Sequence, residues 1–136
     1  MLNKKRGQIS TEYLIIVGFI TFAVLVTLGI AYFYTNSIKD GIKMNQIENF
    51  ANELISTSES IFFAGEPSQL EITGYIPEGV NDIAIVSKEV IFNITTSSGE
   101  NIRSFPSRVV IEGTVSPSSG VKVLQLTAEE DKVVIT

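Results

Sequence analysis

The residues best suited to chemistry stand together near the start of the chain. A basic run of Lys4, Lys5 and Arg6 precedes Gly7, and the carboxylate of Glu12 follows at the border of a long apolar stretch. Moving that carboxylate into hydrocarbon would cost several kcal/mol. An acid at this border therefore predicts that its charge meets a partner inside an assembly.

Elsewhere the composition argues against catalysis. The chain has no histidine and no cysteine, which removes the commonest metal ligand, thiol chemistry and disulfide bonds. The carboxylates are dispersed, so they form no recognisable acid–base pair. The formal net charge is −5, with all 15 acidic residues after Gly7, and this balance disfavours binding to phosphate backbones. We therefore expect no enzymatic activity, no cofactor, no metal and no nucleic-acid partner.

The apolar stretch covers residues 13–34 and contains no charged side chain. As a helix it would be roughly 33 Å long at about 1.5 Å per residue, which is enough to cross a hydrocarbon core of about 30 Å. The basic residues precede it, so the positive-inside rule predicts a cytoplasmic N-terminus and an exported remainder.

Three interpretations fit a basic start followed by such a run. A secretory signal peptide needs a shorter apolar region and a small-x-small cleavage site after it, whereas Gly29 and Ala31 lie inside the run. An uncleaved single-pass anchor explains the composition but explains neither Gly7 nor Glu12. The third interpretation is a leader that is removed before the apolar segment.

The segment RGQISTEYLI supports this third interpretation, because it resembles the class III signal of archaeal type IV-like pilins. That signal has a basic residue and a glycine followed by Q-x-S-x-E-x-x-x-L. Gln8, Ser10 and Glu12 match it, and Ile16 replaces the final leucine. The resemblance is confined to about residues 4–16. It implies that a membrane aspartyl prepilin peptidase cuts between Gly7 and Gln8.

The resemblance also implies how the protein would be used. The peptidase would recognise the basic run, the cleavage junction and the polar residues after it: Lys4, Lys5, Arg6, Gly7, Gln8, Ser10 and Glu12. The precursor would sit in the cytoplasmic membrane, and an assembly ATPase and a platform protein would add it to copies of itself in an extracellular, cell-surface pilus for surface adhesion. A minor or secretion-type pilin and an uncleaved, membrane-anchored binding module are the alternatives.

Two roles are open for Glu12. After cleavage it could neutralise the new ammonium group of Gln8 on an adjacent subunit, which would favour one axial register because an unpaired carboxylate in apolar surroundings is costly. Cyclisation of Gln8 to a lactam would remove that ammonium group. Alternatively, Ser10 and Thr11 start the helix and Glu12 interacts only with the helix dipole in the first turn.

The elements that position these residues follow from periodicity. We predict an α+β fold in which a helix over residues 8–62 packs on a small antiparallel β-sheet head over 66–136. The first half of the helix is apolar on all sides, and its second half is amphipathic, with a stripe turned toward the head. The stripe comprises Ile38, Ile42, Ile47, Phe50, Ala51, Leu54, Ile55, Ile61 and Phe62.

Short β-branched runs between turn residues predict the strands of the head. We expect them near residues 70–76, 82–87, 89–96, 108–115, 121–127 and 132–135. Within the third run, Asn93-Ile94-Thr95 forms an N-x-S/T sequon, so Asn93 is a possible N-glycosylation site if its side chain points outward. The resemblance supports this expectation, because related pilins are glycoproteins.

Overall fold

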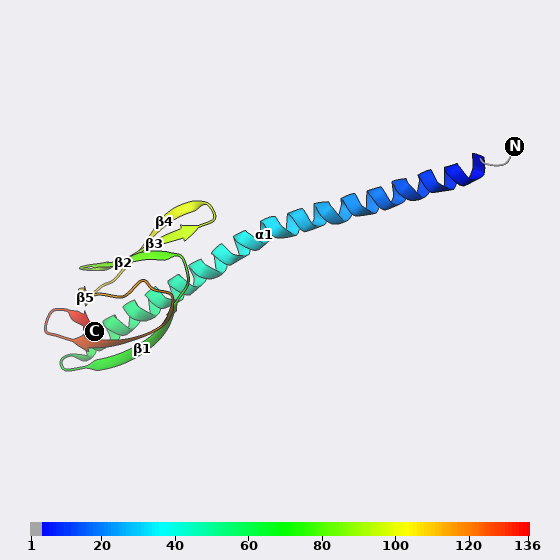
Figure 1. Ribbon diagram of the computed structural model, residues 1–136. Helices are drawn as coiled ribbons and strands as arrows, with labels where there is room; N and C mark the ends of the chain where they lie inside the picture. Colours follow the sequence, from blue (N-terminus) through cyan, green and yellow to red (C-terminus); the bar gives the residue numbers. More distant parts are fainter. Residues whose placement is uncertain (1–3) are drawn as a thin grey trace. The chain divides into compact units, whose positions relative to one another are not determined.

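A computed structural model describes residues 4–136, with side chains from Ser10 onward. Helix α1 spans Lys4–Ala64, and two compact units follow one another along the chain, dividing between Ile38 and Lys39 (Figure 1). The second unit, Lys39–Thr136, is called the head below. Its strands are β1 Gln69–Ile76, β2 Val80–Val86, β3 Glu89–Thr96, β4 Gly99–Pro106, β5 Ile111–Gly113, β6 Gly120–Ala128 and β7 Val133–Ile135.

Helix α1 is long because nothing in its sequence interrupts it. The first proline of the chain is Pro67, and a proline inside a helix would remove a backbone hydrogen bond. The helix ends at Ala64, where Gly65 adopts a positive φ of 86° and its N–H donates to the carbonyl of Phe62 at 3.2 Å. This is a common glycine stop for a helix. The observed bounds are therefore wider than the expected 8–62.

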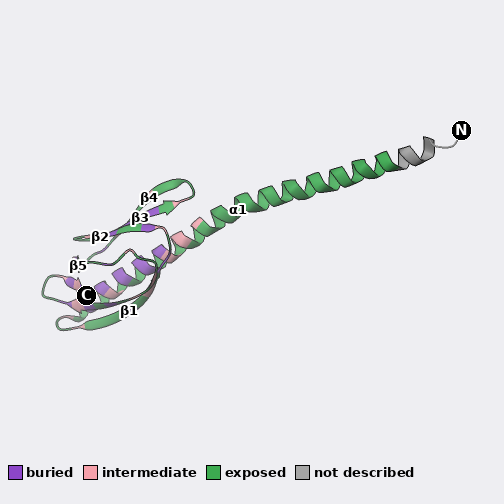
Figure 2. Ribbon diagram, viewed as in Figure 1, coloured by how far each residue is buried: buried purple, intermediate pink, exposed green. Residues whose placement is uncertain are grey.

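Within the head, α1 buries one stripe of its surface, as the amphipathic pattern predicted. Ile47 and Leu54 are almost fully buried, and Figure 2 shows buried residues along this part of the helix. The prediction is wrong at the N-terminal end of the stripe, because Ile38 and Ile42 are not buried but 61% and 53% exposed. Contacts with the strands begin only near Met44, which packs against the core.

The fold is α+β, as predicted, but the head contains two sheets where one was expected. The four-stranded sheet has the order β1-β6-β7-β5, and the three-stranded sheet has the order β2-β3-β4. All pairs are antiparallel except β5 with β7, which are parallel. Two sheets allow the strands to cover more than one side of the same helix, which a single flat sheet cannot do.

Two strand predictions need correction. The expected strand over 108–115 forms ladder bonds only over Ile111–Gly113, although Val109 and Val115 at its ends are buried. Strand β4 lies between the strands expected over 89–96 and 108–115 and was not predicted, because its sequence GENIRSFP carries glycine, proline and few β-branched residues. Antiparallel pairing with β3 stabilises β4 as a strand, although its own sequence has low strand propensity.

Aromatic side chains join the helix to the three-stranded sheet. The ring of Phe50 on α1 meets Phe92 on β3 edge to face with centroids 6.2 Å apart, and Phe92 meets Phe105 on β4 at 5.7 Å. Gly74 on β1 faces the same Phe50 ring so closely that a Cβ placed there would lie 2.2 Å from its Cδ2. The helix is therefore packed between β1 and β3.

Two acidic residues of α1 fasten loops of the head to the helix. The carboxylate of Asp40 accepts a hydrogen bond from the N–H of Ser97 at 3.0 Å and another from the Ser97 hydroxyl. These bonds lower the pKa of Asp40. Further along the helix, Glu59 accepts from the N–H of Arg108 at 3.0 Å. The two contacts hold both ends of the polypeptide that runs through β4.

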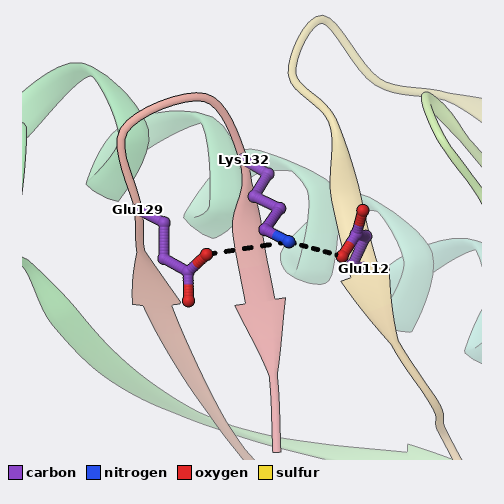
Figure 3. Close-up of polar contacts among 3 residues, drawn as sticks. All are labelled: Glu112, Glu129 and Lys132. Carbon is purple, nitrogen blue, oxygen red and sulfur yellow. Dashed lines mark hydrogen bonds and ion pairs between the residues drawn. The ribbon is translucent and has the colours of Figure 1, made fainter.

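A third polar contact supports the parallel strand pair (Figure 3). The ammonium group of Lys132 lies 2.8 Å from a carboxylate oxygen of Glu112 and 3.7 Å from one of Glu129. The hydrogen bond and negative charge of Glu112 raise the pKa of Lys132. This pair is exposed, so it orients β5 beside β7 more than it stabilises the fold.

Candidate functional site

The most unusual surface of the described chain is the apolar segment of α1, residues 13–34. Its large side chains are exposed along the whole segment, with Phe33 83% and Phe19 72% accessible (Figure 2). Soluble monomers rarely expose a continuous apolar surface of this length. The helix is long and apolar enough to cross a membrane. Water is therefore not the environment for which this surface is suited.

The threonine hydroxyls of this segment and of the next turn are bonded within the helix. The hydroxyls of Thr21 and Thr27 each donate to the carbonyl four residues earlier, on Val17 and Ala23, at 2.8 Å. Thr35 repeats the arrangement with Ala31 at 2.9 Å. Because hydrocarbon offers no hydrogen-bond partners, these internal bonds reduce the cost of lipid contact. They equally suit a dry contact with another helix.

The apolar surface is not uniform. Small side chains leave a shallow hollow on one side of the helix, bordered by bulky neighbours. Its lining residues are Phe19, Ile20, Ala23, Val24, Thr27 and Leu28. In membranes, helices associate by close van der Waals packing, and small residues allow that approach. The segment therefore has the shape as well as the composition for packing against another helix.

The structure places the junction residues differently from the expectation that the helix starts beside them. Because α1 begins at Lys4, Ser10 and Thr11 lie inside the helix and do not cap it, and no acidic residue occupies the first turn. The side chains of Lys4, Lys5, Arg6, Gly7 and Gln8 lie outside the described residues. The dipole role considered for Glu12 therefore does not apply to the uncut chain.

Glu12 itself is exposed in α1. Among the residues whose side chains are described, no ion pair reaches its carboxylate. Its charge therefore faces the surroundings of the helix, immediately before the segment with no charge. A partner for this charge would have to come from outside the described part of the chain.

Asn93 lies on β3, the central strand of the three-stranded sheet. It alternates with the buried residues Phe92 and Ile94, so its side chain is on the outer face of the sheet. The residue is half-buried, and its Oδ1 is buried with no hydrogen-bond partner among the described residues. The third residue of the sequon, Thr95, accepts a hydrogen bond from Asn81 at 2.8 Å. The outward direction that glycosylation requires is thus present.

Sequence reasoning missed the contacts of Asp40 and Glu59. Their partners lie 57 and 49 residues away along the chain, and no local pattern distinguishes these acids from other polar residues on the exposed face of α1. The contact of Asp40 could be predicted only if the turn between β3 and β4 were known. That turn was not predicted, because β4 was not among the expected strands.

Comparison with known proteins gives no match to a family model, to a curated protein or to a solved structure. The arrangement therefore has to be interpreted from its own chemistry. It consists of a long apolar helix followed by β-sheets, a shape consistent with a pilin-like or membrane-anchored protein.

Proposed function

We propose that this chain is the structural subunit of an archaeal type IV-like pilus, cut between Gly7 and Gln8 and polymerised through its N-terminal helix. One observation carries the proposal: a helix with an uncovered apolar segment continues into a head that has its own buried core. The class III signal pattern across the junction adds the cleavage site. The filament would extend from the cell surface and serve adhesion.

The same helical segment would serve in two environments. Before assembly, residues 13–34 would lie in lipid, and afterwards they would pack against the same segment of other subunits. Transfer between two apolar surroundings changes hydration little, so close packing between helices must supply the driving force. Contacts between different faces of successive subunits produce a helical filament when the rotation between subunits does not close a ring.

Glu12 would then set the axial register between subunits. Its carboxylate would meet the ammonium group that cleavage creates on Gln8 of a neighbour, or a hydroxyl donor if Gln8 has cyclised. Replacing Glu12 with Gln keeps the size of the side chain and removes its charge. We expect a large reduction in filament yield, and normal yield would exclude the charge-pairing role.

The decisive experiment is to determine the N-terminal residue of the protein recovered from cells by mass spectrometry. A start at Gln8 supports cleavage, and a cyclised start would show the additional loss of ammonia. An intact Met1 would instead support the second candidate, an uncleaved membrane-anchored binding module. Electron microscopy of purified material then distinguishes a shaft-forming subunit from a minor or secretion-type pilin.

The same mass measurement tests Asn93 as a glycosylation site. A glycan would add mass to the peptide that contains Asn93, and replacing Asn93 with Gln should remove it. An unmodified peptide from the native source would exclude the modification there.

A further inference from the structure

Each sheet of the head ends in a long strand with an open edge. Strand β1 is at one end of the four-stranded sheet and β4 is at one end of the three-stranded sheet. Both strands have 8 residues. An unpaired strand edge presents a row of N–H and C=O groups that can pair with another chain.

The register shows which residues of β1 present those groups. The N–H of Ala128 donates to the carbonyl of Ser68 at 2.9 Å, so this pair forms hydrogen bonds across the β1–β6 ladder. Because hydrogen-bonded pairs alternate along an antiparallel ladder, Thr73 and Tyr75 direct their backbone groups away from β6. Both residues are exposed.

The same reasoning applies to β4. The N–H of Ser107 donates to the carbonyl of Lys88 at 2.7 Å, which places the next hydrogen-bonded pairs at every second residue of β4. Ile102 and Ser104 therefore direct their backbone groups away from β3. Both are exposed, Ile102 to 69%.

The two edges run in opposite directions along the helix of the head. Strand β1 follows the end of α1 and returns beside it, so that Thr73–Tyr75 border a hollow together with residues of α1 between Gln46 and Glu53. Strand β4 runs the other way, from the turn that Asp40 holds toward the residues that Glu59 holds. Two heads with parallel helices therefore bring β1 and β4 together as antiparallel strands.

We propose that β4 of one copy pairs with β1 of the next, with Ser104 opposite Thr73 and Ile102 opposite Tyr75. This inference rests on the proposed function, because it specifies how neighbouring heads contact each other in the filament. Since the two edges differ, each head pairs through β1 with one neighbouring copy and through β4 with another. Such a head-to-tail contact continues along a filament when the rotation between copies does not close a ring.

Charge complementarity favours a second copy as the partner. In this register Arg103 of the added strand lies opposite Gly74, beside the hollow bordered by Gln46, Asn49 and Glu53. Within its own head Arg103 borders a different hollow with Met44 and Glu48. Among the described residues Arg103 has no ion pair. The hollow has room for the guanidinium group of Arg103, and Glu53 on its border supplies the opposite charge.

Cysteine cross-linking tests this register directly, because the chain contains no native cysteine. We would introduce Thr73→Cys and Ser104→Cys together in the full chain. Opposed residues of a hydrogen-bonded antiparallel pair have Cα atoms about 5.5 Å apart, which falls within the disulfide range of about 4.4–6.8 Å. The two positions lie on edge strands of different sheets, and only a bond between separate copies produces covalent multimers.

Purified material would be imaged by electron microscopy, oxidised and separated on a non-reducing denaturing gel. We expect a ladder of covalent multimers from filaments of the double variant. The control pair, Thr127→Cys with Ser104→Cys, keeps one edge cysteine and moves the other to the outer face of β6. It should remain almost entirely monomeric on the gel.

The outcomes separate the inference from the function on which it rests. Filaments that yield only monomers overturn the strand pairing and leave the filament function standing. A ladder without filaments supports the pairing and contradicts the filament function. Monomers without filaments contradict both.

A proline substitution provides a second test that does not depend on cysteine geometry at that position. The N–H of Thr73 faces the open edge, so Thr73→Pro removes a donor that the head does not use. Thr73→Val keeps the N–H and serves as the matched control. With cysteines at Tyr75 and Ile102 as reporters, Thr73→Pro should lower the cross-linked yield about tenfold relative to Thr73→Val. Equal yields would overturn the pairing.

Discussion

Replacing Gly74 with Ala tests how tightly α1 packs against β1. A Cβ at this position would lie 2.2 Å from Cδ2 and 2.6 Å from Cε2 of Phe50, whereas non-bonded carbons prefer about 3.5–4.0 Å. The ring would have to retreat by more than about 1 Å to restore normal contact. It has little room, because Phe50 is only 3% exposed and Phe92 lies edge-on beside it.

The expected cost can be bounded from these contacts. Forcing an extra methyl group into a packed core costs about 1–3 kcal/mol. Alanine gains about 0.5–1 kcal/mol over glycine through the lower entropy of its unfolded chain, so the net destabilisation should be about 1.3 kcal/mol at the middle of the two ranges and at most about 2.5 kcal/mol. At about 1.4 kcal/mol per factor of ten, amide exchange through unfolding of the head should accelerate roughly 8-fold and at most about 60-fold.

Hydrogen-exchange mass spectrometry of the detergent-solubilised protein would measure this change in peptides from β1 and α1. Gly41→Ala is the matched control, since a Cβ there meets nothing within 4 Å and alanine is favoured over glycine inside a helix. Its exchange should slow or stay constant. Adding Phe50→Leu to Gly74→Ala should recover part of the loss. Unchanged exchange in Gly74→Ala would refute the close packing described above.

Three further predictions concern the core, the loop contacts and the apolar segment. Leu54→Ala empties a position with 0% exposure and should destabilise the head by about 2–5 kcal/mol, seen as a lower urea midpoint; a shift no larger than that of a surface substitution would contradict the central place of Leu54. Because the folded-state pKa of Asp40 lies below its ordinary value of 3.8, its contribution to stability is complete above that pH and is lost as the pH falls below it. Thermal unfolding above and below pH 3.8 should therefore show a larger drop for the natural chain than for Asp40→Asn, and parallel curves would rule out the contact with Ser97. For the proposed filament, Thr27→Val should leave membrane insertion and filament yield unchanged, since the hydroxyl donates to Ala23 of its own helix; a loss of filaments, seen by electron microscopy, would show that the hydroxyl has a partner in another subunit.

The parts of the fold that depend on local periodicity could be predicted from the sequence. The spacing of Ile47, Phe50 and Leu54 identified the buried stripe of α1, and all three are buried. Along β6, the buried Leu124 and Leu126 alternate with the exposed Val123 and Gln125, a period of two that is present in the sequence itself. In both cases neighbouring residues in the sequence report the same buried face.

Features that depend on distant partners could not be predicted. Strand β4 exists because β3 pairs with it, and β5 pairs in parallel with β7, which comes after it along the chain. The end of the stripe at Ile42 depends on how far the strands extend along the helix. For the candidate site, the apolar segment was evident from composition, while the hollow around Ala23 and the bonds of Asp40 required three-dimensional positions.

The position of β7 has a consequence for the order of events during folding. This strand comes after every other strand of the head along the chain, yet it lies between β6 and β5 in its sheet. Val133 and Ile135 are buried there, and Thr136 exchanges backbone bonds with Gln125. Until β7 has left the ribosome, β5 lacks its partner strand and β6 lacks one of its two partner strands. The ribosome must therefore release nearly all of the head before its larger sheet can close.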